Sequence, residues 1–206
     1  IKQVLKIPSA ILIFLQGLFG CVPWSIITTF LTDFFAVDGK LGVGTAAAVL
    51  FSFGLGCSLG TVLGTRIGET LYRRSKHFLP AFMSATCVTG AFLLLVLLSL
   101  PESPFRDSFW LYHVVAFLAG SQAAVPGNHA KAILMNSTAS NLRGTAFGIL
   151  RFMDDVGKVL GPISVSWLVS PFGRKFAFMV GVSCWLPCAI FLGLLCITVT
   201  ADEKRH

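Results

Sequence analysis

Six long apolar segments run through this chain of 206 residues and restrict what it can fold into. A helix needs about 20 apolar residues to cross roughly 30 Å of hydrocarbon, and each segment is of that length. The expected helices span residues 9–35, 44–65, 78–100, 109–132, 144–169 and 176–200. The connecting segments are short and rich in turn-forming or charged residues. The pattern predicts an all-α membrane protein, with residues 1–206 forming one six-helix transmembrane domain.

Composition and charge agree with a membrane protein. Hydrophobic residues make up 55% of the chain and charged residues 12%, against about 25% charged in soluble domains. The net charge of +7 is spread over segment ends, which favours anionic lipid rather than nucleic acid as the partner. An even number of helices places both termini on one side. Most basic residues outside the helices fall there, so we expect both termini to be cytoplasmic, in a membrane that the sequence does not identify.

Four glycines spaced four residues apart share one face of the second expected helix and its continuation. They are Gly56, Gly60, Gly64 and Gly68. Residues four apart lie on the same side of a helix, and glycine lets a neighbouring backbone approach closely. The spacing predicts a close helix contact, either static or able to slide.

An acid and two arginines follow this ridge: Glu69, Arg73 and Arg74. They could form a charge clasp that holds one conformation, or a solvated loop. The segment resembles the loop of the major facilitator superfamily of secondary transporters, with the pattern G-x-x-x-[DE]-R-x-G-[RK]-[RK]. These three residues match its acidic and basic positions, whereas its arginine is replaced by Thr70 and its two glycines by Thr65 and Tyr72. The resemblance implies a partial conformational motif, into which Gly64 and Gly68 lead.

The densest cluster of charge lies inside the fifth expected helix, at Arg151, Asp154, Asp155 and Lys158. An isolated charge at mid-helix costs roughly 2.5–3.5 kcal/mol on insertion scales, so these groups must be paired or hydrated. The spacing of four predicts the pairs Asp154–Lys158 and Arg151–Asp155. Neighbouring residues project about 100° apart, so the two acids occupy different environments. We expect one to bind a proton, another coupling ion or a polar substrate group; a purely structural ion-pair network is the alternative.

The same helix carries three glycines and a proline at fixed spacing: Gly148, Gly157, Gly161 and Pro162. This resembles the pattern G-x8-G-x3-G-P on the fifth helix of major facilitator transporters, although the glycine pair that usually follows is replaced. A Gly-Pro step weakens the hydrogen-bond ladder, which predicts a bend.

Further polar residues are candidates to line a cavity. On the first helix Gln16 and Trp24 flank an expected interruption at Gly17, Gly20 and Pro23. They are candidates because transporters bind ligands at broken helices. On the fourth helix the candidates are Gln122, Asn128 and His129. His129 lies close enough to the cytoplasmic end for us to expect solvation there, and a bend is expected at Pro187.

Three stretches together resemble a spinster-like group of facilitator transporters in plants, algae and protists. They are Pro23-Trp24, the segment 141–147, and D-D-x-G-K-x-x-G-P at 154–162. The resemblance implies that the chain is the C-terminal half of a twelve-helix protein, with a missing N-terminal six-helix half as its partner. The implied function is secondary transport of a small organic solute or lipid by alternating access, with proton coupling as one form of it.

Two other classes compete with this interpretation. A rhomboid-type intramembrane protease is the enzyme alternative, with Ser121, His113 and His129 present but without the glycine that should follow the serine. An uncoupled six-helix pore is the other, although known filter motifs are missing. No pair of His and Glu has metal-ligand spacing, so we expect no enzyme activity, metal or cofactor.

Overall fold

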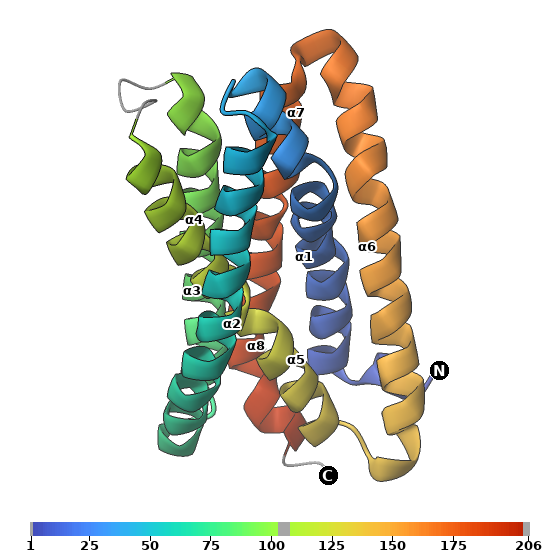
Figure 1. Ribbon diagram of the computed structural model, residues 1–206. Helices are drawn as coiled ribbons and strands as arrows, with labels where there is room; N and C mark the ends of the chain where they lie inside the picture. Colours follow the sequence, from blue (N-terminus) through green and yellow to red (C-terminus); the bar gives the residue numbers. More distant parts are fainter. Residues whose placement is uncertain (1, 103–107, 204–206) are drawn as a thin grey trace.

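Six helical rods form the bundle, and successive rods run in opposite directions (Figure 1). The computed structural model describes residues 2–102 and 108–203. The α-helices in these ranges are α1 (Pro8–Asp33), α2 (Val43–Arg74), α3 (Phe78–Ser99), α4 (Phe109–Ala123), α5 (Val125–Asn136), α6 (Arg143–Phe172), α7 (Arg174–Ser183) and α8 (Trp185–Glu203). Because α4 leads directly into α5 and α7 into α8, each of these pairs makes one interrupted rod.

Four helical segments are long and apolar enough to cross a membrane. They are Pro8–Asp38, Val43–Arg74, Phe78–Ser99 and Arg174–Thr200. The other two expected spans, 109–132 and 144–169, are helical but more polar: α4 and α5 carry Gln122, Asn128 and Lys131, and α6 carries the charge cluster. The structure therefore supports four of the six expected spans and has the helices of a multi-pass integral membrane protein.

The helix interruptions lie only partly where the sequence suggested. The expected break at Gly17, Gly20 and Pro23 is wrong, because α1 is continuous from Pro8 to Asp33. The sixth rod is interrupted at Cys184, close to the bend expected at Pro187, and the fourth rod is interrupted at Ala124. Proline lacks an N–H and cannot donate to the carbonyl four residues earlier, so Pro126 and Pro187 each weaken the helix just before them. The helical assignment of α6 runs through Pro162.

The glycine ridge of α2 packs directly on the rod formed by α4 and α5. A Cβ atom at Gly60 would overlap the carbonyl oxygen of Ser121, and Gly120 in turn meets the carbonyl oxygen of Phe53. The partners of Gly56, Gly60, Gly64 and Gly68 are Phe117, Ser121, Val125 and His129, in that order. Both series advance by four residues, so the two rods run parallel. This first glycine seam confirms the predicted close helix contact.

A second glycine seam joins α6 to α1. A Cβ at Gly157 would overlap the carbonyl oxygen of Leu18, and one at Gly161 would meet the side chain of Ser25. No atom lies within 4 Å of the corresponding position at Gly148. Two of the three glycines predicted to pack on this helix therefore do so, and Gly148 does not.

Side-chain hydrogen bonds join α3 to α8, which run antiparallel. The Ser84 hydroxyl donates to the carbonyl oxygen of Ala189 at 2.8 Å, and the Cys87 thiol donates to that of Trp185 at 3.3 Å. The third helix pair is therefore held by side chains rather than by backbone contact at glycine.

At the end of the bundle away from the termini, Arg174 pairs with both Asp33 and Asp38.

The first seam predicts that Gly60→Ala destabilises the protein. The added methyl group must push the Ser121 backbone away, and overpacking of this kind costs about 1–3 kcal/mol. Gly54→Ala is the matched control, because Gly54 lies on the same helix with open space around it. Thermal unfolding followed by size-exclusion chromatography in detergent measures both; equal melting temperatures for the two variants would contradict the seam.

The second seam predicts a local effect of Gly157→Ala. Displacing α6 from Leu18 should speed hydrogen–deuterium exchange in peptides of both α1 and α6, because the backbones separate. Gly148→Ala, on the open face of the same helix, should leave exchange in α1 unchanged. If the two variants exchange alike, the contact between α1 and α6 is not as described.

Candidate functional site: a central cavity with one unpaired acid

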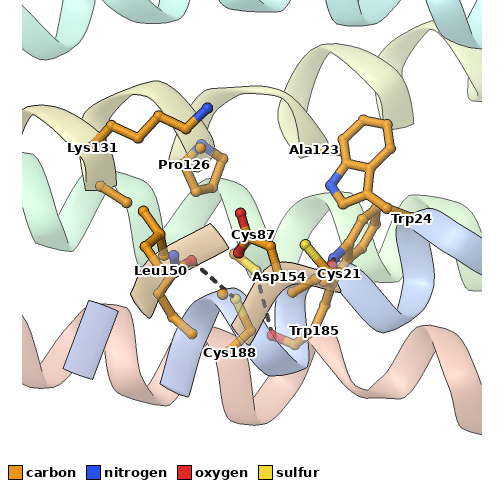
Figure 2. A pocket seen from close by; sticks show the side chains of 15 residues that line it. Cys21, Trp24, Cys87, Ala123, Pro126, Lys131, Leu150, Asp154, Trp185 and Cys188 are labelled. Carbon is orange, nitrogen blue, oxygen red and sulfur yellow. Dashed lines mark hydrogen bonds between the residues drawn. The ribbon is translucent and has the colours of Figure 1, made fainter. Parts of the chain in front are cut away.

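A cavity of about 120 Å³ lies near the middle of the bundle (Figure 2). Side chains from α1, α3, α4, α5, α6 and α8 line it. Its charged residues are Asp154 and Lys131, its aromatic residues are Trp24 and Trp185, and the remaining lining is small, apolar or thiol-bearing apart from Gln16. Because residues from both halves of the sequence meet here, this is the site where the rods converge.

Asp154 reaches the cavity from the middle of α6. It lies about 17 Å along the axis from the first residue of a helix that is roughly 45 Å long. Its carboxylate packs against the backbone of α1 at Gly17 and interacts with the side chain of Cys21. Among the residues that the structure describes, no basic nitrogen lies within 4 Å of it. Asp154 is thus a partly buried acid without an ion-pair partner.

Asp155 lies in a different environment, outside the cavity. Its carboxylate forms two ion pairs, one between Oδ2 and Arg151 Nε at 3.1 Å and one between Oδ1 and Lys158 Nζ at 3.0 Å. The predicted Arg151–Asp155 pair is confirmed. The predicted Asp154–Lys158 pair is wrong: Lys158 turns to Asp155, because a residue three positions away is as reachable on a helix as one four away.

The charged side chains around Asp155 lie on a face of α6 that no other described helix covers. Half of the Asp155 side chain is exposed, as are 71% of Arg151 and 42% of Lys158. Large apolar side chains of α6, Phe152 and Trp167 among them, are exposed as well. The two neighbouring acids therefore occupy different environments, as the 100° step between them predicts.

Two of the five predicted cavity residues, Gln16 and Trp24, line the cavity. Trp24 and Trp185 meet edge to face, with ring centroids 6.2 Å apart. The Trp185 indole N–H donates to the carbonyl oxygen of Gly20 at 3.0 Å, which fixes its ring. Gln16 is buried, and its side-chain oxygen lies 3.8 Å from the Cys188 sulfur.

The three candidates from the fourth rod lie elsewhere. Gln122 is placed beside Thr89, whose hydroxyl lies 3.4 Å from its side-chain oxygen. Asn128 is exposed on the surface. His129, expected at the solvated interface, is 7% exposed, and its Nε2 lies 3.0 Å from the carbonyl oxygen of Gly64. The imidazole is buried because it packs against Gly68 in the first glycine seam.

The acid and arginines after the glycine ridge lie on α2 itself. Glu69 and Arg73 form an ion pair at 2.7 Å within the last turns of the helix, with 59% and 77% of their side chains exposed. Arg74 is the last residue of α2 and is also exposed. The segment predicted as a loop is thus helical up to Arg74, and the Glu69–Arg73 pair lies within one helix.

Sequence reasoning missed several groups that line the cavity. Lys131 is the most consequential, since it is the cation that faces the same space as Asp154. The others are Cys21, Cys87, Cys188 and Trp185. Lys131 and Pro126 are five residues apart on one rod, and a lysine so close to a helix-breaking proline was the available signal.

Other chemical groups show no assembled site in the described ranges. There, no three side chains among His, Cys, Asp and Glu gather as metal ligands would. The Ser121 hydroxyl donates to the carbonyl oxygen of Leu118, at a point where its backbone packs on Gly60. Of the two histidines considered with it, His113 lies 2.7 Å from the Ser52 hydroxyl and His129 contacts Gly64.

Comparison with known proteins adds no identity to this description. No protein family, no curated protein and no solved structure matches the chain. Over residues 2–102 and 108–203, the structure shows an all-helical protein with four helices suited to crossing a membrane, and with one acid in its central cavity that has no ion-pair partner there.

Proposed function

We propose that this chain is one half of a secondary transporter of the major facilitator type, working by alternating access. The observation that carries the proposal is Asp154, a carboxylate that faces a central cavity at mid-helix without an ion-pair partner. Ionisable groups within membrane-spanning helices are costly and mark ion or substrate pathways. Its position where the rods converge supports a role in binding rather than in packing.

The pairing of the rods supports the proposal through an internal repeat. In this repeat, α1 corresponds to the rod of α4 and α5, α2 corresponds to α6, and α3 corresponds to the rod of α7 and α8. The first seam, between α2 and the rod of α4 and α5, then corresponds to the second seam, between α6 and α1. The contact between α3 and the rod of α7 and α8 corresponds to itself, because these two rods exchange places. Exchanged rods run in opposite directions, so the repeats would be inverted (Figure 1). Inverted repeats of three helices are the plan of each half of a major facilitator transporter.

The open face of α6 supports the idea that the bundle is only half of the functional unit. Arg151, Asp155 and Lys158 would contact hydrocarbon there if lipid covered this face, at a cost of several kcal/mol. A second six-helix half, with a water-filled path between the two, would leave these groups hydrated. The proposed partner is therefore the N-terminal half that the resemblance implies.

The chemistry proposed for Asp154 is reversible occupation by a cation. Its carboxylate lies beside the Cys21 side chain and the α1 backbone and forms no ion pair with the described residues, so a proton, another coupling ion or a cationic substrate group can bind without displacing one. Release to the other side would follow when the cavity opens there. Asp155, held between two cations, has a structural role in this scheme.

An intramembrane hydrolase remains the second candidate, on the single observation that Ser52 and His113 are 2.7 Å apart. A serine within reach of an imidazole is the basis of nucleophilic catalysis. Neither residue lines the central cavity, however, and the Ser52 hydroxyl also lies 3.1 Å from the carbonyl oxygen of Ala48. The arrangement favours transport.

Uptake by the full-length protein in sealed liposomes tests the proposal. Sugars, amino acids, organic anions and lysolipids form the panel, with and without a pH gradient. Asp154→Asn should abolish uptake driven by the gradient, because the amide cannot bind and release a cation. Asp155→Asn is the matched control on the same helix and should retain uptake.

Both variants must first be shown to be folded and correctly reconstituted, by size-exclusion chromatography and by the amount in the vesicles. Undiminished gradient-driven uptake in Asp154→Asn would remove the coupling role. Loss of uptake in Asp155→Asn alone would transfer that role to the open face of α6.

A further inference from the structure

The two charged groups of the central cavity have opposite signs and come from different rods. Asp154 belongs to α6 and Lys131 to α5. Neither forms an ion pair within 4 Å of a partner among the described residues. The cavity therefore offers one anionic and one cationic contact to a ligand, and its formal charge is zero.

This balance selects against ligands with a single charge. A cation that neutralised Asp154 would leave Lys131 uncompensated and repulsive, and an anion at Lys131 would do the same to Asp154. Asp154 is partly buried, so an uncompensated charge beside it is costly, whereas Lys131 is exposed and partly hydrated. A molecule that carries both charges meets both contacts without changing the net charge of the site.

The distribution of aromatic groups gives the ligand a direction. Figure 2 shows Lys131 and Pro126 on one side of Asp154 and the indoles of Trp24 and Trp185 on the other. Indole rings attract cations through the negative charge of their π faces, so the cationic group is favoured between Asp154 and the tryptophans. The anionic group is then favoured towards Lys131.

We infer that the cavity binds a small zwitterion, with its ammonium group at Asp154 beside Trp24 and Trp185 and its anionic group at Lys131. The inference names the substrate class of the proposed transporter and rests on that proposal. A free zwitterion of the betaine or amino-acid kind and the headgroup of a zwitterionic lipid share this chemistry. The cavity volume of about 120 Å³ suits a group of that size.

Equilibrium binding to the purified protein in a non-ionic detergent tests the inference without requiring transport. Radiolabelled glycine betaine is the probe, and choline, isovalerate and phosphocholine are competitors that supply the cation, the anion and both. Betaine should bind, and phosphocholine should displace it better than choline or isovalerate. Replacing phosphocholine by a short-chain phosphatidylcholine distinguishes the free molecule from the lipid headgroup, and displacement by either supports the inference.

The variants assign each charge. Lys131→Gln and Asp154→Asn should each weaken betaine binding by about tenfold or more, because each leaves one charge of the ligand without its partner. Lys131→Arg keeps the positive charge and should restore most of the affinity, which separates a charge effect from misfolding. Lys6→Gln, an exposed lysine outside the cavity, is the matched control and should bind as the wild type does.

Two results would overturn the inference. Choline displacing betaine as well as phosphocholine does, with Lys131→Gln unaffected, would make this a simple cation site. No betaine binding to a protein that transports a sugar or an organic anion would reject the substrate class but leave the proposed function intact. Betaine binding with no gradient-driven transport would support the substrate class but reject the proposed function.

Discussion

Backbone contact at glycine is the interaction on which the rest of this bundle depends. In lipid, apolar side chains gain little by leaving the solvent, so helices associate through close packing and polar contacts. The two seams supply that packing, α2 against α4 and α5, and α6 against α1. The second seam also sets the rotation of α6 about its axis. With Gly157 and Gly161 turned towards α1, Asp154 faces the cavity and Asp155 faces away.

The parts of the fold that follow from local periodicity could be predicted from the sequence. Gly56, Gly60, Gly64 and Gly68 share a face by helical geometry alone, so their contact with another helix was predictable. Gly148 follows the same logic but has no neighbour, because contact also requires a partner helix at that height. The 100° step between adjacent residues predicts separate environments for the two acids, whereas their assignment needs the position of α1.

The site itself could be predicted only in part, because its residues meet across long sequence separations. Asp154, Gln16 and Trp24 were recognisable by residue type and depth in the helix. Cys87 reaches the cavity from a rod whose rotation is set by tertiary packing, and for Lys131 the nearby proline was a signal of a helix break but not of the direction in which the lysine points. The break expected at Pro23 was misplaced for a related reason: a proline weakens a helix, but neighbouring helices decide whether it breaks.

The two seams also determine which parts of the bundle can move against each other. Backbones in direct contact must lift apart before they slide, so we expect α1 to move with α6, and α2 with α4 and α5. Shear between these two blocks is opposed mainly by side chains. Asp154 rides on one block with Gly17 and Cys21, while Lys131 rides on the other. Any displacement of the blocks therefore changes the separation of these two charges, and with it the electrostatic energy of the empty cavity.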